Sequence, residues 1–292
     1  MKNKLHLKYL IFTALSTFLI LFLITRNHKG IKGKKILVTA PINYNNRLSK
    51  LIEESEAEAI IMPSIKIILN YNNPSLDTIF NNLSQYKYIC LPSRNAIRVF
   101  FTKAKRLNIN HNTLSQPIYS AIGKDVEFLR TFDVDKILEC KTASPQGIID
   151  ALKLKKDITN KKIAVLTPEV IGLSEPNVIP NLLKDLKDIG LRVKRINAYT
   201  TKINDDTDFS KEINDIKSGN IDLIAFTSSA EIEALLSIIG GRKELKNTKI
   251  SCFGPYTSFH AKKWGLEPCF VSKDYSSFER YIESMNTYFI KD

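Results

Sequence analysis

Short apolar runs alternate with amphipathic segments from residue 34 to the end of the chain. Residues 34–41, 87–92 and 161–168 form three such runs, as buried parallel strands do, and each ends at a proline, which cannot donate to a strand ladder. In the segments between the runs, apolar residues recur every three or four positions, which indicates helices that pack on one side. This alternation of strands and helices predicts an α/β protein built on parallel sheets.

One unit of strand, polar turn and helix occurs twice in the sequence. The first copy spans residues 88–101 and the second spans residues 221–236. After each copy a further strand follows, and it ends at a glycine, Gly123 in the first case and Gly254 in the second. The repetition predicts two similar α/β halves.

An uncharged stretch of 17 residues, Tyr9–Thr25, lies between Lys8 and Arg26. Its length is at the lower limit for a membrane helix, about 17–25 residues, and no small-residue cleavage site follows it. We therefore interpret it as a retained hydrophobic anchor, one helix preceding the folded part. Because more basic residues follow the stretch than precede it, the globular part is expected on the cytoplasmic side. The alternative is a removable leader, with the protein in an organelle lumen of the plastid type.

Charge and composition narrow the classes of ligand. The net charge is +13, but residues 1–35 hold eight of the 43 Lys and Arg and no acid. The rest of the chain has 35 basic and 30 acidic residues, which suits an anionic small ligand and lacks the basic clusters of nucleic-acid-binding proteins. The four cysteines form no C-x-x-C pair and the four histidines show no metal-ligand spacing, so we expect reduced thiols and no metal. Asn-rich stretches such as residues 43–46 are interpreted as compositional bias.

Helix starts that follow the strands are candidate anion sites, because free backbone N–H groups and the helix dipole favour negative charge there. Ser144, followed by Pro145, is the clearest helix cap among them. Helix capping without ligand binding is the alternative for each of these hydroxyls. Arg94 and Lys124 are candidates for pairing with ligand carboxylates, with solvation at the surface as their alternative.

Several motifs resemble those of the uroporphyrinogen-III synthase family. The segment "CFGPYTSFHAKKWGL", residues 252–266, is similar to the family pattern I-G-P-x-T-A-x-A-x-x-x-G-L. The turns "FTSSAEI" at 226–232 and "LPSRNAI" at 91–97 resemble its F-T-S-x-x-A/G-V motif, and "RINAYTT" places Tyr199 on the family's functional tyrosine. The resemblance runs in order from about Lys34 to the C-terminus.

The resemblance implies two parallel-sheet, flavodoxin-like domains, of which the first is discontinuous. Two long alternating runs lie between the halves, and we interpret them as a two-strand crossover. The implied boundaries are, in chain order, an anchor or leader at 1–33, domain 1 at 34–60 plus 203–292, domain 2 at 70–191, and crossovers at about 60–69 and 192–203.

The resemblance also implies the activity. Members of the family close the linear tetrapyrrole hydroxymethylbilane to uroporphyrinogen III without a cofactor, with inversion of the D ring and loss of water. Tyr199 is implied as the catalytic residue, acting as a general acid directly or through a water molecule. Substrate binding is expected from the turns, mainly those of the second copy: Ser93, Asn95, Gly123, Ser144, Thr227, Ser228, Ser229, Gly254, Pro255, Tyr256 and Thr257. We expect a monomer whose partner is the linear tetrapyrrole and not a nucleic acid.

The sequence is also compatible with two other functional classes. A membrane-tethered, two-lobed binding protein would hold an anionic ligand without turnover and would need no proton donor. A structural membrane adaptor would not require paired polar turns. A dinucleotide enzyme is disfavoured, because no G-x-G-x-x-G follows the first strand.

Overall fold

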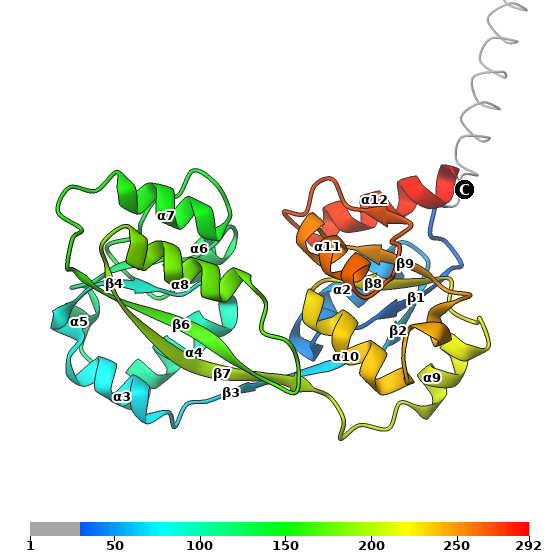
Figure 1. The fold of residues 1–292 in the computed structure, drawn as a ribbon, viewed down its shortest axis with the longest axis horizontal. Helices are drawn as coiled ribbons and strands as arrows, with labels where there is room; N and C mark the ends of the chain where they lie inside the picture. Colours follow the sequence, from blue (N-terminus) through cyan, green and yellow to red (C-terminus); the bar gives the residue numbers. More distant parts are fainter. Residues whose placement is uncertain (1–29, 292) are drawn as a thin grey trace, which may run out of the picture.

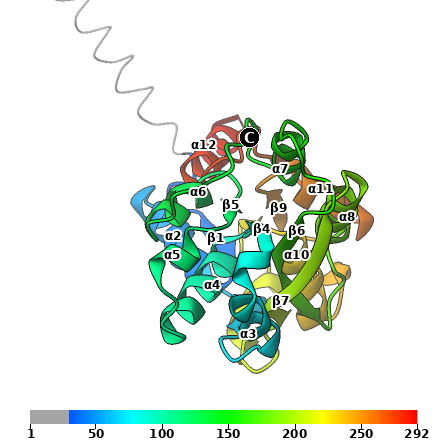
Figure 2. The same ribbon diagram turned by 90° about the vertical axis from the view of Figure 1, so that its left-hand side faces the viewer.

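The computed structural model describes residues 30–291 and shows two lobes joined by a pair of long strands (Figure 1). Each lobe is a five-stranded sheet covered by helices, and the end-on view shows helices on both sides of the strands of the second lobe (Figure 2). The predicted anchor, residues 9–25, lies outside the described residues. Among residues 30–291, no helix is both long and apolar enough to span a membrane.

The sheet of the first lobe is wholly parallel, with strand order β2-β1-β8-β9-β10. Its strands are β1 (Lys35–Val38), β2 (Glu58–Ile61), β8 (Leu223–Phe226), β9 (Lys249–Cys252) and β10 (Phe270–Val271). The helices of this lobe are α2 (Ile42–Glu54), α9 (Ser210–Lys217), α10 (Ser229–Ile239), the 3-10 turn η2 (Arg242–Leu245), α11 (Pro255–Lys263) and α12 (Phe278–Lys291). In such doubly wound sheets, ligands bind outside the carboxyl ends of the strands, where the strand order reverses.

The sheet of the second lobe has the order β3-β7-β6-β4-β5 and is parallel except for its edge strand β3. Its strands are β3 (Ile65–Leu69), β4 (Tyr86–Cys90), β5 (Ile118–Ser120), β6 (Lys162–Ile171) and β7 (Arg192–Ile203). Its helices are α3 (Pro74–Asn81), the 3-10 turn η1 (Leu83–Gln85), α4 (Arg94–Arg106), α5 (His111–Leu114), α6 (Asp125–Arg130), α7 (Pro145–Lys153) and α8 (Val178–Asp188). The prediction of an α/β fold with parallel-dominated sheets is confirmed.

Each sheet separates two apolar cores. In the first lobe, Leu37 and Ile224 face one core, whereas their neighbours Ile36 and Leu223 face the other, and all four are fully buried. This follows from the alternation of side chains along a strand, and it explains why the central strands are apolar without interruption. Full burial of such a side chain contributes about 1.5–3 kcal/mol.

The chain crosses between the lobes twice, before β3 and after β7. The two strands pair antiparallel, from Ile65 opposite Ile203 to Leu69 opposite Tyr199. At the crossing itself, Asn204 donates from Nδ2 to the Pro63 carbonyl (2.9 Å) and from its backbone N–H to the Ser64 carbonyl (2.9 Å). Both predicted crossover runs therefore end as strands of the second sheet, and the crossing backbone itself is short and hydrogen-bonded.

Candidate active site

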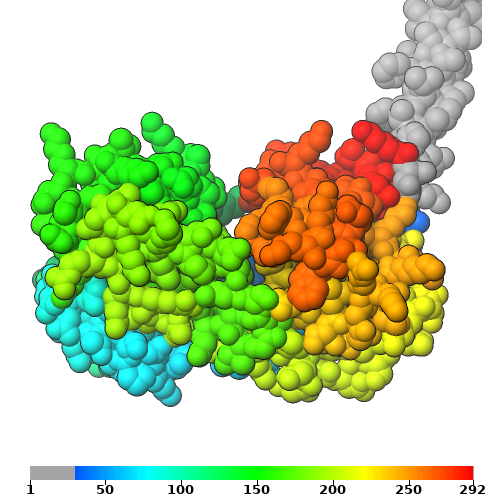
Figure 3. Space-filling view, viewed as in Figure 1, coloured from blue at the N-terminus to red at the C-terminus, as the bar shows by residue number. Residues whose placement is uncertain are grey.

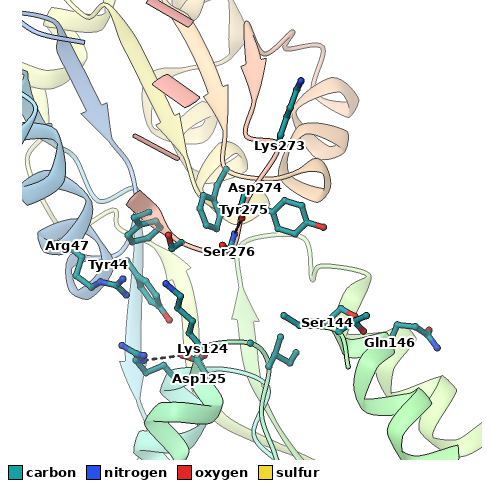
Figure 4. Close-up of a pocket in the computed structure, with 18 of the residues that line it drawn as sticks. Tyr44, Arg47, Lys124, Asp125, Ser144, Gln146, Lys273, Asp274, Tyr275 and Ser276 are labelled. Carbon is teal, nitrogen blue, oxygen red and sulfur yellow. Dashed lines mark hydrogen bonds and ion pairs between the residues drawn. The ribbon is translucent and has the colours of Figure 1, made fainter. Parts of the chain in front are cut away.

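A cavity of about 1160 Å³ lies between the two lobes, where the space-filling view shows a hollow in the surface (Figure 3). Both lobes line it, mainly with residues that follow the carboxyl ends of strands (Figure 4). The lining residues are Tyr44, Arg47, Arg94, Ile122, Gly123, Lys124, Asp125, Thr142, Ala143, Ser144, Gln146, Asp150, Phe253, Lys273, Asp274, Tyr275, Ser276, Ser277 and Phe278. Its position is that expected for a ligand site in doubly wound sheets.

The wall from the first lobe is built by α2 and by the segment after β10. Tyr44 and Arg47 lie one turn apart on α2, which begins directly after β1 and Pro41. Phe278 contacts both side chains: its ring lies edge-on to Tyr44 at 6.5 Å between centroids, and the Arg47 guanidinium lies 5.2 Å from its centroid. These contacts orient an aromatic hydroxyl and a cation toward the opposite lobe.

The wall from the second lobe is built by the starts of α4, α6 and α7. Arg94 is the first residue of α4 and Asp125 the first of α6, and Arg94 Nε lies 3.2 Å from Asp125 Oδ1. Ser144 caps α7 by accepting from the Gly147 N–H at 3.1 Å. Gly123 has φ of +57°, a left-handed conformation that favours glycine.

The cavity is polar and carries both signs of charge. Its basic side chains are Arg47, Arg94, Lys124 and Lys273, and its acidic ones are Asp125, Asp150 and Asp274. Burial raises the pKa of Asp125, and Arg94 opposes this shift. Burial likewise raises the pKa of Tyr44, to which the negative charge of Asp125 adds. Tyr44 and Asp125 belong to different lobes, so charged groups of one lobe act on titratable groups of the other across the cavity.

Tyr199, the predicted catalytic residue, lies on β7 behind this wall. Its side chain is 7% exposed, and its hydroxyl is 2.9 Å from Ser93 Oγ. Burial raises the pKa of Tyr199 to about 12, whereas the bond with Ser93 lowers it. Ser93 also caps α4 by accepting from the Ala96 N–H at 3.2 Å. Neither residue lines the cavity formed by residues 30–291, although their neighbour Arg94 does.

The second copy of the turn is organised by a buried carboxylate. Glu231 is 1% exposed and accepts from Thr39 Oγ1 (2.9 Å), the Thr227 N–H (2.9 Å), Thr227 Oγ1 and Ser228 Oγ (2.9 Å). Burial raises the pKa of Glu231, and these donors oppose the shift. The hydroxyls of Thr227 and Ser228, predicted to bind substrate, therefore point to Glu231 inside the first lobe.

The Gly254 turn lies beside this network. Thr257 is buried and donates from Oγ1 to the Thr227 carbonyl at 3.4 Å, which links the two turns. Gly254 has extended backbone, and a Cβ built on it would lie 3.3 Å from the Tyr275 ring. Tyr256 is 40% exposed on α11, and Pro255 before it is also exposed.

The structure thus brings two of the predicted binding residues of the turns, Gly123 and Ser144, to the cavity, together with Arg94 and Lys124, the candidates for pairing with ligand carboxylates. Asn95 and Ser229 are buried in the first turns of α4 and α10, and neither they nor the other predicted residues line the cavity within the described chain. The prediction omits Tyr44, Arg47 and the segment 273–278. The signal for the last was present, because "SKDYSSF" repeats the pattern of a polar turn between a strand and a helix.

No group of three or more His, Cys, Asp or Glu side chains that could hold a metal ion occurs in residues 30–291. The four cysteines are free thiols. Burial raises the pKa of Cys90 and Cys252 to about 12, so both thiols are protonated at neutral pH.

Comparison with known proteins gives consistent matches. A family model described as uroporphyrinogen-III synthase HemD matches residues 46–279. The porphyrin biosynthesis protein HemD of Ruminiclostridium josui is 22% identical over 265 residues, which cover 88% of this chain and 49% of that protein. The chain therefore spans about half the length of that relative. A putative uroporphyrinogen-III synthase of Methanothermobacter thermautotrophicus is 25% identical over 237 residues, covering 78% of this chain and 89% of that protein.

Among solved structures, a mutant uroporphyrinogen III synthase of the extremely thermophilic bacterium Thermus thermophilus matches with a TM-score of 0.56. The match covers 87% of this chain and 99% of that chain at 14% identity. At this level of identity, the likeness shows a shared fold.

Proposed function

The chain belongs to the uroporphyrinogen-III synthase family, and we propose that it converts hydroxymethylbilane to uroporphyrinogen III in the cavity between its lobes. The observation that carries this proposal is the cavity itself, to which both lobes contribute cations and hydroxyls. The reaction closes the ring with inversion of the D ring and releases one water molecule per substrate.

The walls of the cavity suit a large polyanion. Each ring of the substrate bears carboxylates, and Arg47 of the first lobe and Arg94 and Lys124 of the second lobe offer cations to them. The Lys273 amino group points away from Arg47 and Lys124 (Figure 4). Arginine adds a planar fork of donors that matches a carboxylate. The cavity volume, about 1160 Å³, exceeds the roughly 300–1,000 Å³ of drug-sized ligand sites, as a tetrapyrrole requires.

Confinement supplies much of the catalysis in this proposal. The hydroxymethyl end must lose water, and the cation that remains must meet the far pyrrole ring before it reacts elsewhere. Cations on both lobes hold the two ends of the linear tetrapyrrole near each other, so the two reacting ends are positioned and need not meet by random motion. Tyr199 remains a proposed participant: it bonds to Ser93, which adjoins Arg94 on the wall of the cavity.

The experiment that tests the proposal is an isomer assay. Hydroxymethylbilane is generated enzymatically and mixed with the purified protein, and the type III and type I products are separated by chromatography. We expect the type III isomer in excess, at a rate proportional to the protein concentration. Formation of the type I isomer alone, at the rate of a heat-denatured control, would contradict the proposal.

We propose separately that residues 9–25 anchor the protein, as a monomer, with the catalytic lobes on the cytoplasmic side. The support comes from the sequence, in which the apolar stretch is flanked more heavily by basic residues on its C-terminal side. Fractionation of native membranes followed by intact-mass measurement tests the anchor. A mature chain that begins after residue 25 would contradict it.

A further inference from the structure

Asp125 contributes a carboxyl group to the wall of the cavity. It is the first residue of α6, and 25% of its side chain is exposed. Arg94 Nε holds its Oδ1 at 3.2 Å, and the Arg94 guanidinium lies in turn 4.8 Å from the centroid of the Phe128 ring. The carboxyl group is therefore fixed in orientation while it still faces the cavity.

Charged and titratable groups from both lobes interact with Asp125 or with Tyr44 opposite it. Arg94 and Arg98 come from α4, Tyr44 and Arg47 from α2 of the opposite lobe, Tyr199 from β7, and Lys124 precedes it in the chain. Figure 4 shows Tyr44 reaching from α2 toward Asp125 of the opposite lobe. The negative charge of Asp125 raises the pKa of both Tyr44 and Tyr199, so the three groups interact electrostatically.

The chemistry requires two proton transfers. A proton must reach the hydroxyl oxygen, so that the C–O bond breaks and both its electrons leave with water. After the carbon–carbon bonds have rearranged, the pyrrole carbon that closed the ring must lose its proton. The two transfers cancel, so one group can serve as the acid and then as the base, and no other reagent is needed.

We propose that Asp125 is this group, that Arg94 positions it, and that Tyr44 completes the site from the opposite lobe. The protonated carboxyl donates to the leaving hydroxyl, its carboxylate lies beside the resulting cation, and the same carboxylate takes the proton from the ring-closing carbon. This inference rests on the proposed function. Tyr199 is less suited to the step, because it is engaged with Ser93 and lies behind the wall.

The pKa of Asp125 is shifted in the direction that a general acid needs. Burial raises the pKa of Asp125, and Arg94 and Arg47 oppose the shift. When the substrate binds, its carboxylates neutralise these arginines, which raises the pKa of Asp125 further. The acid form is needed for loss of the hydroxyl, so kcat is expected to fall as pH rises through the raised pKa of Asp125 in the complex.

The test compares Asp125→Asn and Asp125→Glu with Glu127→Gln, a matched control. Glu127 lies on the same helix, its side chain is 77% exposed, and it pairs only with Arg130 among the described residues. Rates of type III formation are measured across pH for each variant. Asp125→Asn is expected to lower kcat by about 100-fold, with little change in KM and without the high-pH decline of the wild type. Asp125→Glu should retain part of kcat, and Glu127→Gln all of it.

Two results would overturn the inference. One is wild-type kcat and an unchanged pH profile in Asp125→Asn. The other applies if circular dichroism shows that Asp125→Asn does not fold, so that the test rests on Asp125→Glu, whose carboxyl has a different pKa and position. The decline of kcat at high pH must then be shifted in Asp125→Glu, and an unshifted pH profile would contradict the role of Asp125. Wild-type protein that forms only the type I isomer would instead refute the proposed function, so the two failures are distinguishable.

Discussion

The two copies of the strand–turn–helix unit share a backbone shape but use their hydroxyls in opposite ways. In the first copy, Ser93 caps α4 through the Ala96 N–H and contacts Tyr199. In the second copy, Ser228 makes no side-chain cap to the described start of α10 and donates to Glu231 instead. Glu231 stands where the first copy has Ala96. One substitution at an equivalent position thus turns a helix cap into a buried network.

The two copies also differ in what the residue after the serine contributes to the cavity. The first copy places Arg94 on the cavity wall, whereas its counterpart Ser229 is buried at the start of α10. The first lobe contributes to the cavity through Tyr44, Arg47 and the segment after β10 instead. In the copy that better keeps the family sequence, the hydroxyls of the turn therefore bond inside the first lobe, whereas the other copy contributes Arg94 to the cavity proposed to bind the substrate.

The largest effect is expected for Glu231→Ala, which removes the carboxylate that distinguishes the second copy from the first. We expect the free energy of unfolding to fall by about 3 kcal/mol, because Thr39, Thr227 and Ser228 would lose a buried acceptor. Urea unfolding followed by circular dichroism measures the change. Ser237→Ala, at an exposed position of the same helix, is the control. A loss below about 1 kcal/mol would show that the network contributes little.

The second test substitutes the residue that follows the serine in each copy, Arg94 in the first and Ser229 in the second. Arg94→Gln is expected to lower kcat/KM by about 30-fold, equivalent to about 2 kcal/mol, because it removes a cation from the cavity and the partner of Asp125. Ser229→Ala in the second copy should leave kcat/KM close to the wild-type value. Lys105→Gln, exposed on α4, controls for the loss of charge. The reverse ranking of Arg94→Gln and Ser229→Ala would return substrate binding to the second copy.

Much of the fold was predictable, because buried parallel strands leave uninterrupted apolar runs that a single sequence displays. The run at 161–168 predicts a strand that ends at Pro168, but β6 continues to Ile171. A register shift between Thr167 and Pro168 accommodates the proline, which has no N–H to donate. Such a bulge depends on the neighbouring strand β7, and its geometry is invisible in the pattern of one segment.

The site was predictable only in part. Gly123 and Ser144 follow from local rules, since each is a residue that a turn or a helix start favours. Tyr44 and Arg47 lie in an Asn-rich stretch, and only their spacing of one helical turn directly after the first strand marks them. Glu231 resembles an ordinary residue of a first helical turn, and its burial depends on Thr39, 192 positions away. Contacts between distant segments decide which hydroxyls line the cavity and which bond inside a lobe.

The smallest expected effect concerns the capping serine of the first copy. Ser93→Ala should lower the free energy of unfolding by about 1 kcal/mol, because the Ala96 N–H loses its acceptor. Ser144→Ala removes a similar cap from α7 together with a contact to Thr142 Oγ1 (3.2 Å), so the difference between the two variants compares the Ser93–Tyr199 contact with the Ser144–Thr142 contact. Chemical unfolding measures both variants side by side. Equal losses would mean that the contact of Ser93 with Tyr199 stabilises the fold no more than the contact of Ser144 with Thr142 does.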